Sequence, residues 1–227
     1  MLGPLDAAGF SPLHSNRRAL SEGDIALGAA AWKEITCPDP ASITKAATAA
    51  AETQTGTRYA ADPALTLPHL APALIRWLEQ LPSFENGLNR SEHQISAVLS
   101  SGPCSLRDCY MRSHHDVEEW IWLGDWSFAW YVQQMSEVAH PLVVFADGSR
   151  ITTESLEPFR NTFGSRQVQL TDLGGDVLAG KADAVDVNGI DRWFGGAHLR
   201  TVDHWRWDAQ TKLAVSRRSE RRHQPRE

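Results

Sequence analysis

The chain has 227 residues, of which 42% are hydrophobic and 22% charged, with nine tryptophans and a formal net charge of −6. This composition is typical of a globular protein, and a domain of this length can bury about 70% of its unfolded surface without disulfides. The sequence has neither a membrane-spanning apolar run nor a secretory signal, and three cysteines fit a reducing compartment, so we expect a soluble cytoplasmic protein with no membrane contact.

Residues 1–66 are predicted to form an N-terminal helical segment and a linker. Ser21, followed three residues later by Asp24, is typical of a helix start. A proline placed directly after an N-cap aspartate opens a second, alanine-rich helix over residues 40–52. Residues 53–66 contain little to bury and have the composition of a linker.

Residues 67–139 carry helical signals. Apolar stripes and N-cap residues predict four helices, which begin near Pro68, Asn89, Ser105 and Asp125. The last of them runs over 125–139 and buries one face that includes Phe128 and Met135.

The apolar period then changes to that of β-strands. Residues 142–145, followed by an Asp-Gly turn, predict a hairpin that returns at residues 151–152. A further strand is expected around Val168, then a short helix capped by Thr171, and one or two Trp-rich strands over 185–207.

Residues 209–227 are predicted to be a disordered basic tail. Residues 212–227 hold six lysines and arginines against two glutamates, a charge of +4, which leaves −10 on the rest of the chain. An acidic body repels phosphate, so general affinity for nucleic acid is not expected.

The order of predicted elements from 89 to 180 ends in a helix introduced by Leu-Thr-Asp-x-Gly-x-x-Val-Leu-x-Gly, and it resembles a winged helix-turn-helix. The stretches 70–102 and 188–208 resemble an uncharacterised bacterial family. Its members carry an N-terminal domain of unknown function, a helical region and a winged-helix-like C-terminal part. This chain begins about where that N-terminal domain would end, so we expect the domain to be absent.

This resemblance implies a fold class but no activity. We expect an α+β, mainly helical protein, in which N-terminal helices precede a winged helix-turn-helix-like domain over 67–208 that ends in a short Trp-rich β element. No cofactor or metal is expected. Cys104, Cys109, His114 and His115 lack the spacing of a zinc site and instead predict a small buried cysteine pair beside a solvent-facing histidine loop.

A DNA-binding role is an alternative that the charge pattern disfavours. In helix-turn-helix docking the second helix of the motif enters the major groove, which here is residues 125–139. No lysine or arginine lies between Arg112 and Arg150, although these side chains make most contacts to phosphates and bases. Gln133 and Gln134 leave base recognition open, but a module that packs against another protein fits better.

Trp126 and Trp130 are the candidate interface. They lie one turn apart, away from the predicted core face of their helix. Aromatic side chains on a second helix face usually pack against a neighbouring domain or subunit.

The segment 188–198 is the candidate ligand or partner site. Its candidate residues are Asn188, Asp191, Arg192, Trp193, Gly195, Gly196 and His198. Asp191 could orient His198 while Arg192 holds an anion, as a ligand-binding or enzymatic domain would require. In the structural alternative, Asp191 and Arg192 form an ion pair or turn and the glycines form a bulge.

Because no matching nucleophile or second acid accompanies that segment, we assign no catalytic residue. The sequence most favours a non-catalytic winged-helix-like interaction or regulatory module with a protein partner. The alternatives are a DNA-binding transcription regulator and a ligand-binding or enzymatic domain centred on 188–198.

Overall fold

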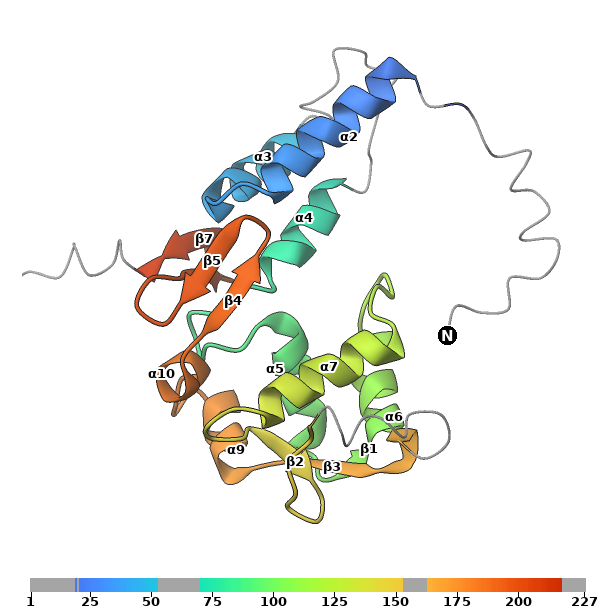
Figure 1. Ribbon diagram of the computed structural model, residues 1–227, viewed down its shortest axis with the longest axis vertical. Coiled ribbons are helices and arrows are strands. Elements are labelled where there is room, and N and C mark those ends of the chain that lie inside the picture. Colours follow the sequence, from blue (N-terminus) through green and yellow to red (C-terminus); the bar gives the residue numbers. More distant parts are fainter. Residues whose placement is uncertain (1–18, 20, 53–69, 153–162, 218–227) are drawn as a thin grey trace, which may run out of the picture.

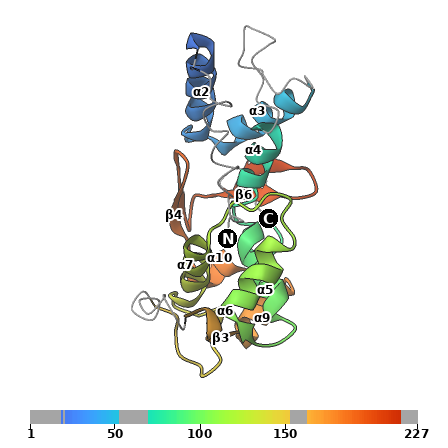
Figure 2. The same cartoon turned by 90° about the vertical axis from the view of Figure 1, so that its right-hand side faces the viewer.

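The computed structural model describes residues 19, 21–52, 70–152 and 163–217. Over these residues the protein is α+β and mainly helical, with eight α-helices and small antiparallel sheets. Figures 1 and 2 show two bodies stacked along the long axis, one built from both ends of the described chain and one from its middle. No helix among the described residues is long and apolar enough to cross a bilayer.

The first body, which we call the terminal body, joins N-terminal helices to C-terminal hairpins. Its helices are α2 (Glu22–Ile35), α3 (Pro40–Glu52) and α4 (Leu70–Leu78). Its strands are β4 (Asp191–Phe194), β5 (Ala197–Arg200), β6 (Trp205–Asp208) and β7 (Leu213–Ser216). β4 pairs with β5 and β6 with β7, and both hairpins pack on α3 and α4 around Leu78, Leu199 and Trp207.

The second body, which we call the central body, contains the middle of the chain. Its helical elements are α5 (Arg90–Leu99), α6 (Leu106–Tyr110), the π-helical turn η2 (Met111–His115), α7 (Asp125–Ser136), the short turn η3 (Phe163–Ser165) and α9 (Asp172–Leu178). Its strands are β1 (Cys104–Ser105), β2 (Val143–Phe145) and β3 (Gln167–Leu170), in the order β1-β3-β2. The helices pack on this sheet around Ile95, Phe128 and Phe145.

Helix starts agree with the N-cap chemistry of the sequence. Ser21 accepts a hydrogen bond from the Asp24 amide, and Asn89 and Glu92 form a reciprocal capping box at the start of α5. Thr171 caps α9 through its hydroxyl, which accepts the Gly174 amide at 3.0 Å. The N-cap of α7 is Gly124, one residue before the expected Asp125.

Three β predictions were wrong. β2 pairs with β3 rather than with residues 151–152, because Ile151 is buried and its N–H donates to Ser136 Oγ at 2.9 Å. Residues 213–216, expected in a disordered tail, form β7; residues 218–227 lie outside the described residues. The predicted strand segment 185–207 also begins with a helix, α10 (Ala184–Asn188).

A buried charged cluster ties β6 to the chain before α10. The Arg206 guanidinium donates to both carboxylate oxygens of Asp183, to the Ser83 carbonyl and to His204 Nε2. His204 Nδ1 in turn donates to the Arg200 carbonyl at 3.0 Å, so His204 is held as the neutral ring. Burial and the nearby Arg206 charge lower the pKa of His204.

Candidate functional site

Large apolar side chains gather on the loop between η2 and α7 and on the outer face of α7. Of the eleven exposed large hydrophobic residues among those described, six lie between residues 117 and 130. We call them the aromatic surface: Val117, Trp120, Ile121, Trp122, Trp126 and Trp130. Each of these side chains is between 44% and 62% exposed. In a folded chain, most large apolar side chains in such a stretch are normally buried. In Figure 1 the loop projects from the start of α7 towards α4.

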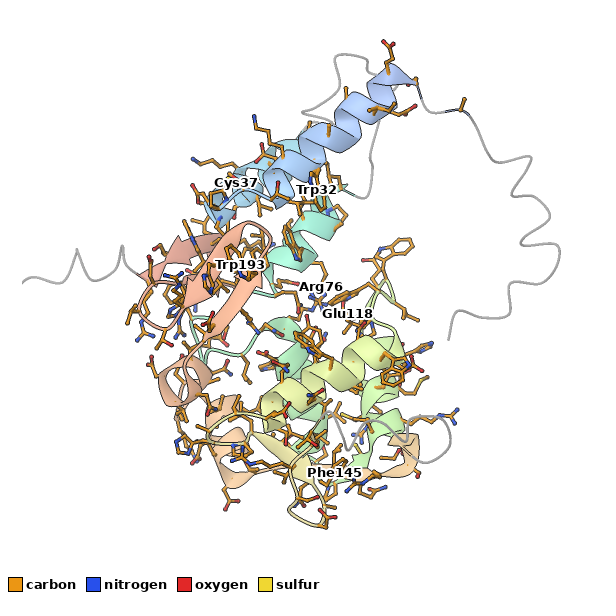
Figure 3. The ribbon with its side chains drawn as sticks, in the orientation of Figure 1. Trp32, Cys37, Arg76, Glu118, Phe145 and Trp193 are labelled. Carbon is orange, nitrogen blue, oxygen red and sulfur yellow. The ribbon has the colours of Figure 1, made fainter. Side chains whose placement is uncertain are left out.

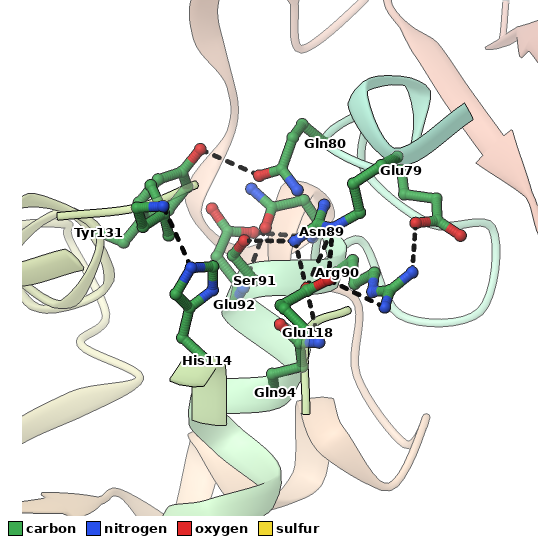
Figure 4. A network of polar contacts seen from close by, with 12 residues as sticks. Glu79, Gln80, Asn89, Arg90, Ser91, Glu92, Gln94, His114, Glu118 and Tyr131 are labelled. Carbon is green, nitrogen blue, oxygen red and sulfur yellow. Dashed lines mark hydrogen bonds and ion pairs between the residues drawn. The ribbon is translucent and has the colours of Figure 1, made fainter. Parts of the chain in front are cut away.

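Glu118 anchors this loop to both bodies. Its side chain is only 4% exposed and receives Arg76 of α4 at 2.7–3.1 Å, Arg90 of α5 at 3.1 Å and Gln94 of α5 at 2.9 Å. Figure 4 shows this network, and Figure 3 shows Arg76 and Glu118 between the two bodies. Burial acts to raise the pKa of Glu118, but the hydrogen bonds and positive charges outweigh it, and the net shift is downward.

A second set of contacts fixes the base of the loop. The Leu123 amide donates to His114 Nε2 at 3.1 Å, and the Tyr110 hydroxyl donates to the Leu123 carbonyl at 2.8 Å. Trp122 lies edge-on to His114 and under the Arg76 guanidinium, which is 4.9 Å from its ring centre. The loop is therefore held by its ends while Trp120 and Ile121 stay exposed.

The expectation of a solvent-facing histidine loop was wrong for His114. The ring is 1% exposed because it accepts the Leu123 amide and packs between Tyr110 and Trp122. Burial lowers the pKa of His114, so the ring is neutral at neutral pH.

Trp126 and Trp130 occupy the outer face of α7, as their spacing predicts. Phe128, Val132 and Met135 are buried on the inner face of the same helix. Tyr131, which follows Trp130 in α7, donates from its hydroxyl to Gln80 Oε1 at 2.9 Å and so joins α7 to the end of α4.

The candidate segment 188–198 is divided between the two faces of the β4–β5 hairpin. On the outer face Asp191 Oδ1 lies 2.5 Å from His198 Nε2, Trp193 stacks on His198, and Arg200 Nε donates to His198 Nδ1. Arg192 lies on the opposite face. The arrangement that the enzymatic hypothesis needs, with Asp191, Arg192 and His198 around one ligand, is therefore not formed.

The remaining candidate residues of this segment have structural contacts. Arg192 donates to Glu92 at 3.0 Å and to the Gln80 carbonyl, so its ion-pair partner is not Asp191. Asn188 hydrogen-bonds both the N–H and the carbonyl of His140.

Gly195 and Gly196 form a two-residue hairpin turn rather than a bulge. Gly195 has a φ of 54°, and a Cβ on it would overlap the Ile35 carbonyl. A Cβ on Gly196 would overlap the Thr36 carbonyl. The glycines thus let the turn approach the end of α2.

One pocket connects this segment with α7. It has a volume of about 370 Å³, within the range of small-molecule sites, and its polar lining includes Gln134, Asn188, Asp191 and Arg192. His198 does not line it. The charged residues that line this pocket already have partners within the protein: Arg192 pairs with Glu92, and Asp191 pairs with His198.

The arginines that follow β2 and precede β3 are engaged within the protein. Arg150 donates to the Val138 and Ala139 carbonyls at the end of α7. Arg166 pairs with Asp147 and lies over the Phe145 ring. The outer face of α7 presents tryptophans and the acids Asp125 and Glu137 rather than cations.

Comparisons with known proteins give no further assignment: no family model, no curated protein and no solved structure matches the chain. Within the described ranges, no group of three or more His, Cys, Asp or Glu side chains is placed to hold a metal ion. The Glu118 network and the exposed loop tip were not predicted from the sequence. The sequence feature that could have indicated this loop tip is the run of four apolar residues, 120–123, directly after the two acids Glu118 and Glu119.

Proposed function

We propose that this chain is a non-catalytic interaction or regulatory module whose aromatic surface binds a protein partner. The observation that carries the proposal is that a solvent-exposed apolar loop is fixed in place by a buried carboxylate, Glu118. Six large exposed apolar side chains lie within residues 117–130, and concentrations of exposed apolar surface mark interaction sites in soluble proteins.

Rigid presentation favours binding for a physical reason. A loop that must be ordered on association loses conformational entropy, which reduces affinity. Here the contacts of Glu118 and Leu123 order the loop before any partner arrives. Tryptophan is also among the residues that contribute most to protein–protein interfaces, since it buries a large area with few rotatable bonds.

The charge around this surface indicates the chemistry of the partner. Residues 113–149 contain six acids and neither lysine nor arginine. Glu118 is neutralised by Arg76 and Arg90, but Asp116, Glu119 and Asp125 are exposed acids that neighbour the apolar residues in the chain. Such a surface is complementary to a partner surface that is apolar and basic. The same charge repels the phosphates of DNA, and so the DNA-binding alternative is less favoured.

The order of elements in the central body supports a winged-helix-like module, as does the resemblance to the uncharacterised bacterial family. A helix, a strand, two helices and two strands follow one another, and the sheet order is β1-β3-β2. In this proposal α7 is the second helix of the motif, and its outer face contacts protein through Trp126 and Trp130.

Quantitative co-purification from cells that produce the chain tests the proposal. We compare the wild type with the double variant Trp120→Ala/Ile121→Ala, and with the control Val202→Ala/Leu213→Ala, which removes exposed apolar side chains elsewhere. We expect a protein retained by the wild type and the control but lost by the first variant. Equal recovery by all three would contradict the proposal.

A further inference from the structure

Helix α2 presents an apolar stripe that faces away from the rest of the protein. Ile25 and Trp32 are 60% and 65% exposed, and they lie two helical turns apart, so they are on the same face. Gly28 and Ala29 lie between them, and both are exposed. Figures 1 and 2 show α2 at the end of the terminal body that points away from the central body. The stripe is therefore separate from the aromatic surface.

The opposite face of α2 supplies little packing to hold the helix. The residues described there are half-buried, and Ile35 is the large apolar one among them that packs on the core of the terminal body. No described side chain of α2 is buried. A helix of 14 residues is marginal in water unless an apolar face is packed, so the exposed stripe indicates a further contact.

The charges on α2 indicate what covers the stripe. Glu22 lies in the first turn and Lys33 in the last turn, and both residues are exposed. They are three helical turns apart, so they lie on the same flank of the stripe. When two such helices pack antiparallel, the same flanks face each other, and Glu22 of each copy lies beside Lys33 of the other. A parallel pair would instead bring like charges together and align the two helix dipoles.

We propose that α2 is the interface of a homodimer, in which the exposed stripes of two copies pack antiparallel across a two-fold axis. The axis passes between Gly28 and Ala29, at the midpoint of the helix. Because Ile25 and Trp32 lie equally far from this point, Ile25 of each copy contacts Trp32 of the other. This inference is independent of the proposed partner binding.

The stripe meets the geometric requirements of such an axis. A two-fold interface uses the same patch on both copies, so the patch must be complementary to itself. On α2 the apolar pair and the charged pair both straddle the centre of the helix, a symmetry that an unrelated partner would not require. At this centre a Cβ on Gly28 would meet no atom within 4 Å, so the position is open. Residues as small as Gly28 and Ala29 let two helix axes approach closely.

Sedimentation velocity of the full chain over a wide range of protein concentration tests this interface. We expect a monomer–dimer equilibrium. Glu22→Lys and Lys33→Glu each turn attraction into repulsion at both ends of the helix pair, and each should raise the dimer Kd by about tenfold. An equimolar mixture of the two variants should dimerise again, because each contact between positions 22 and 33 then joins opposite charges. A wild-type chain that stays monomeric at every concentration, or a mixture that does not recover, would overturn the proposal.

Two controls separate this interface from the rest of the surface. Lys45→Glu reverses an exposed charge on the neighbouring helix α3 and should leave the dimer Kd unchanged. Trp120→Ala/Ile121→Ala removes part of the aromatic surface and should also leave it unchanged. If this double variant lost the dimer while Glu22→Lys kept it, self-association would belong to the aromatic surface, and the proposal would be overturned.

Discussion

Replacing Glu118 by alanine tests whether the aromatic loop is held by its buried carboxylate. The substitution removes the acceptor for Arg76, Arg90 and Gln94 and leaves the Arg76 guanidinium largely buried at 16% exposure. Arg76 Nη1 is already buried without a hydrogen-bond partner. The variant therefore leaves a buried cation without its counter-charge.

The expected loss in unfolding free energy follows from these exposures. Removing one member of a buried ion pair costs about 3–5 kcal/mol. Arg90 is 38% exposed, so solvent screens its attraction to Glu118. We therefore expect Glu118→Ala to lower the unfolding free energy by about 3 kcal/mol. Glu118→Gln keeps the shape and loses the charge, and should lie between Glu118→Ala and the wild type.

Urea unfolding followed by far-ultraviolet circular dichroism measures this loss. Glu119→Ala is the matched control because its side chain is exposed, and it should change stability by less than about 0.5 kcal/mol. Hydrogen exchange should also show that the Leu123 amide, protected by His114 in the wild type, exchanges faster in Glu118→Ala. A loss below about 1 kcal/mol, typical of a surface pair, would refute the reasoning.

Three further predictions concern packing, pH and DNA. Gly196→Ala should lower the unfolding free energy by about 2 kcal/mol because its Cβ would overlap backbone at the end of α2, whereas Gly175→Ala, with open space, should not destabilise; equal urea midpoints would count against this packing. Burial lowers the pKa of His114 and His204, so the folded state binds fewer protons than the unfolded state. Stability should be full above pH 6.5 and fall below it, by at most about 1.4 kcal/mol per pH unit for each histidine; unchanged urea midpoints from pH 7.5 to 5.5 would exclude this linkage. In fluorescence anisotropy with random duplex DNA at moderate salt, a chain ending at Arg217, which keeps β7, should not bind; binding that weakens steeply with salt would instead support the transcription-regulator alternative.

Local chemistry explains which parts of the fold could be predicted. The caps at Ser21, Asn89 and Thr171 were predicted because an N-cap side chain bonds to backbone only two or three residues away. The outward position of Trp126 and Trp130 followed from helical periodicity, which also depends only on near neighbours.

Strand pairing and the two-body packing depend on distant residues. β2 pairs with β3 across more than twenty residues, and β7 is a strand because β6 and α3 cover it. Leu213, Ala214 and Val215 are apolar, but a run of three such residues is too short to predict a strand on its own. Long-range packing decided both outcomes.

In the candidate site, too, local patterns were predictable from the sequence and contacts between distant residues were not. Asp191 and Arg192 lie on opposite faces because successive residues of a strand alternate between its faces. This could have been predicted from the sequence, since a strand was expected there. The contacts of Glu118 join residues 24 to 42 positions apart and follow no local pattern. Only the folded chain could reveal them.

Photo-crosslinking in cells that produce the chain tests the central claim most directly. A benzophenone side chain is placed at Ile121, which belongs to the aromatic surface, and in a control chain at Val202, which is more exposed (70% against 48%). We expect light to produce an adduct with another protein from position 121 and not from position 202. Absence of such an adduct at position 121, or crosslinking only within the same chain, would contradict it.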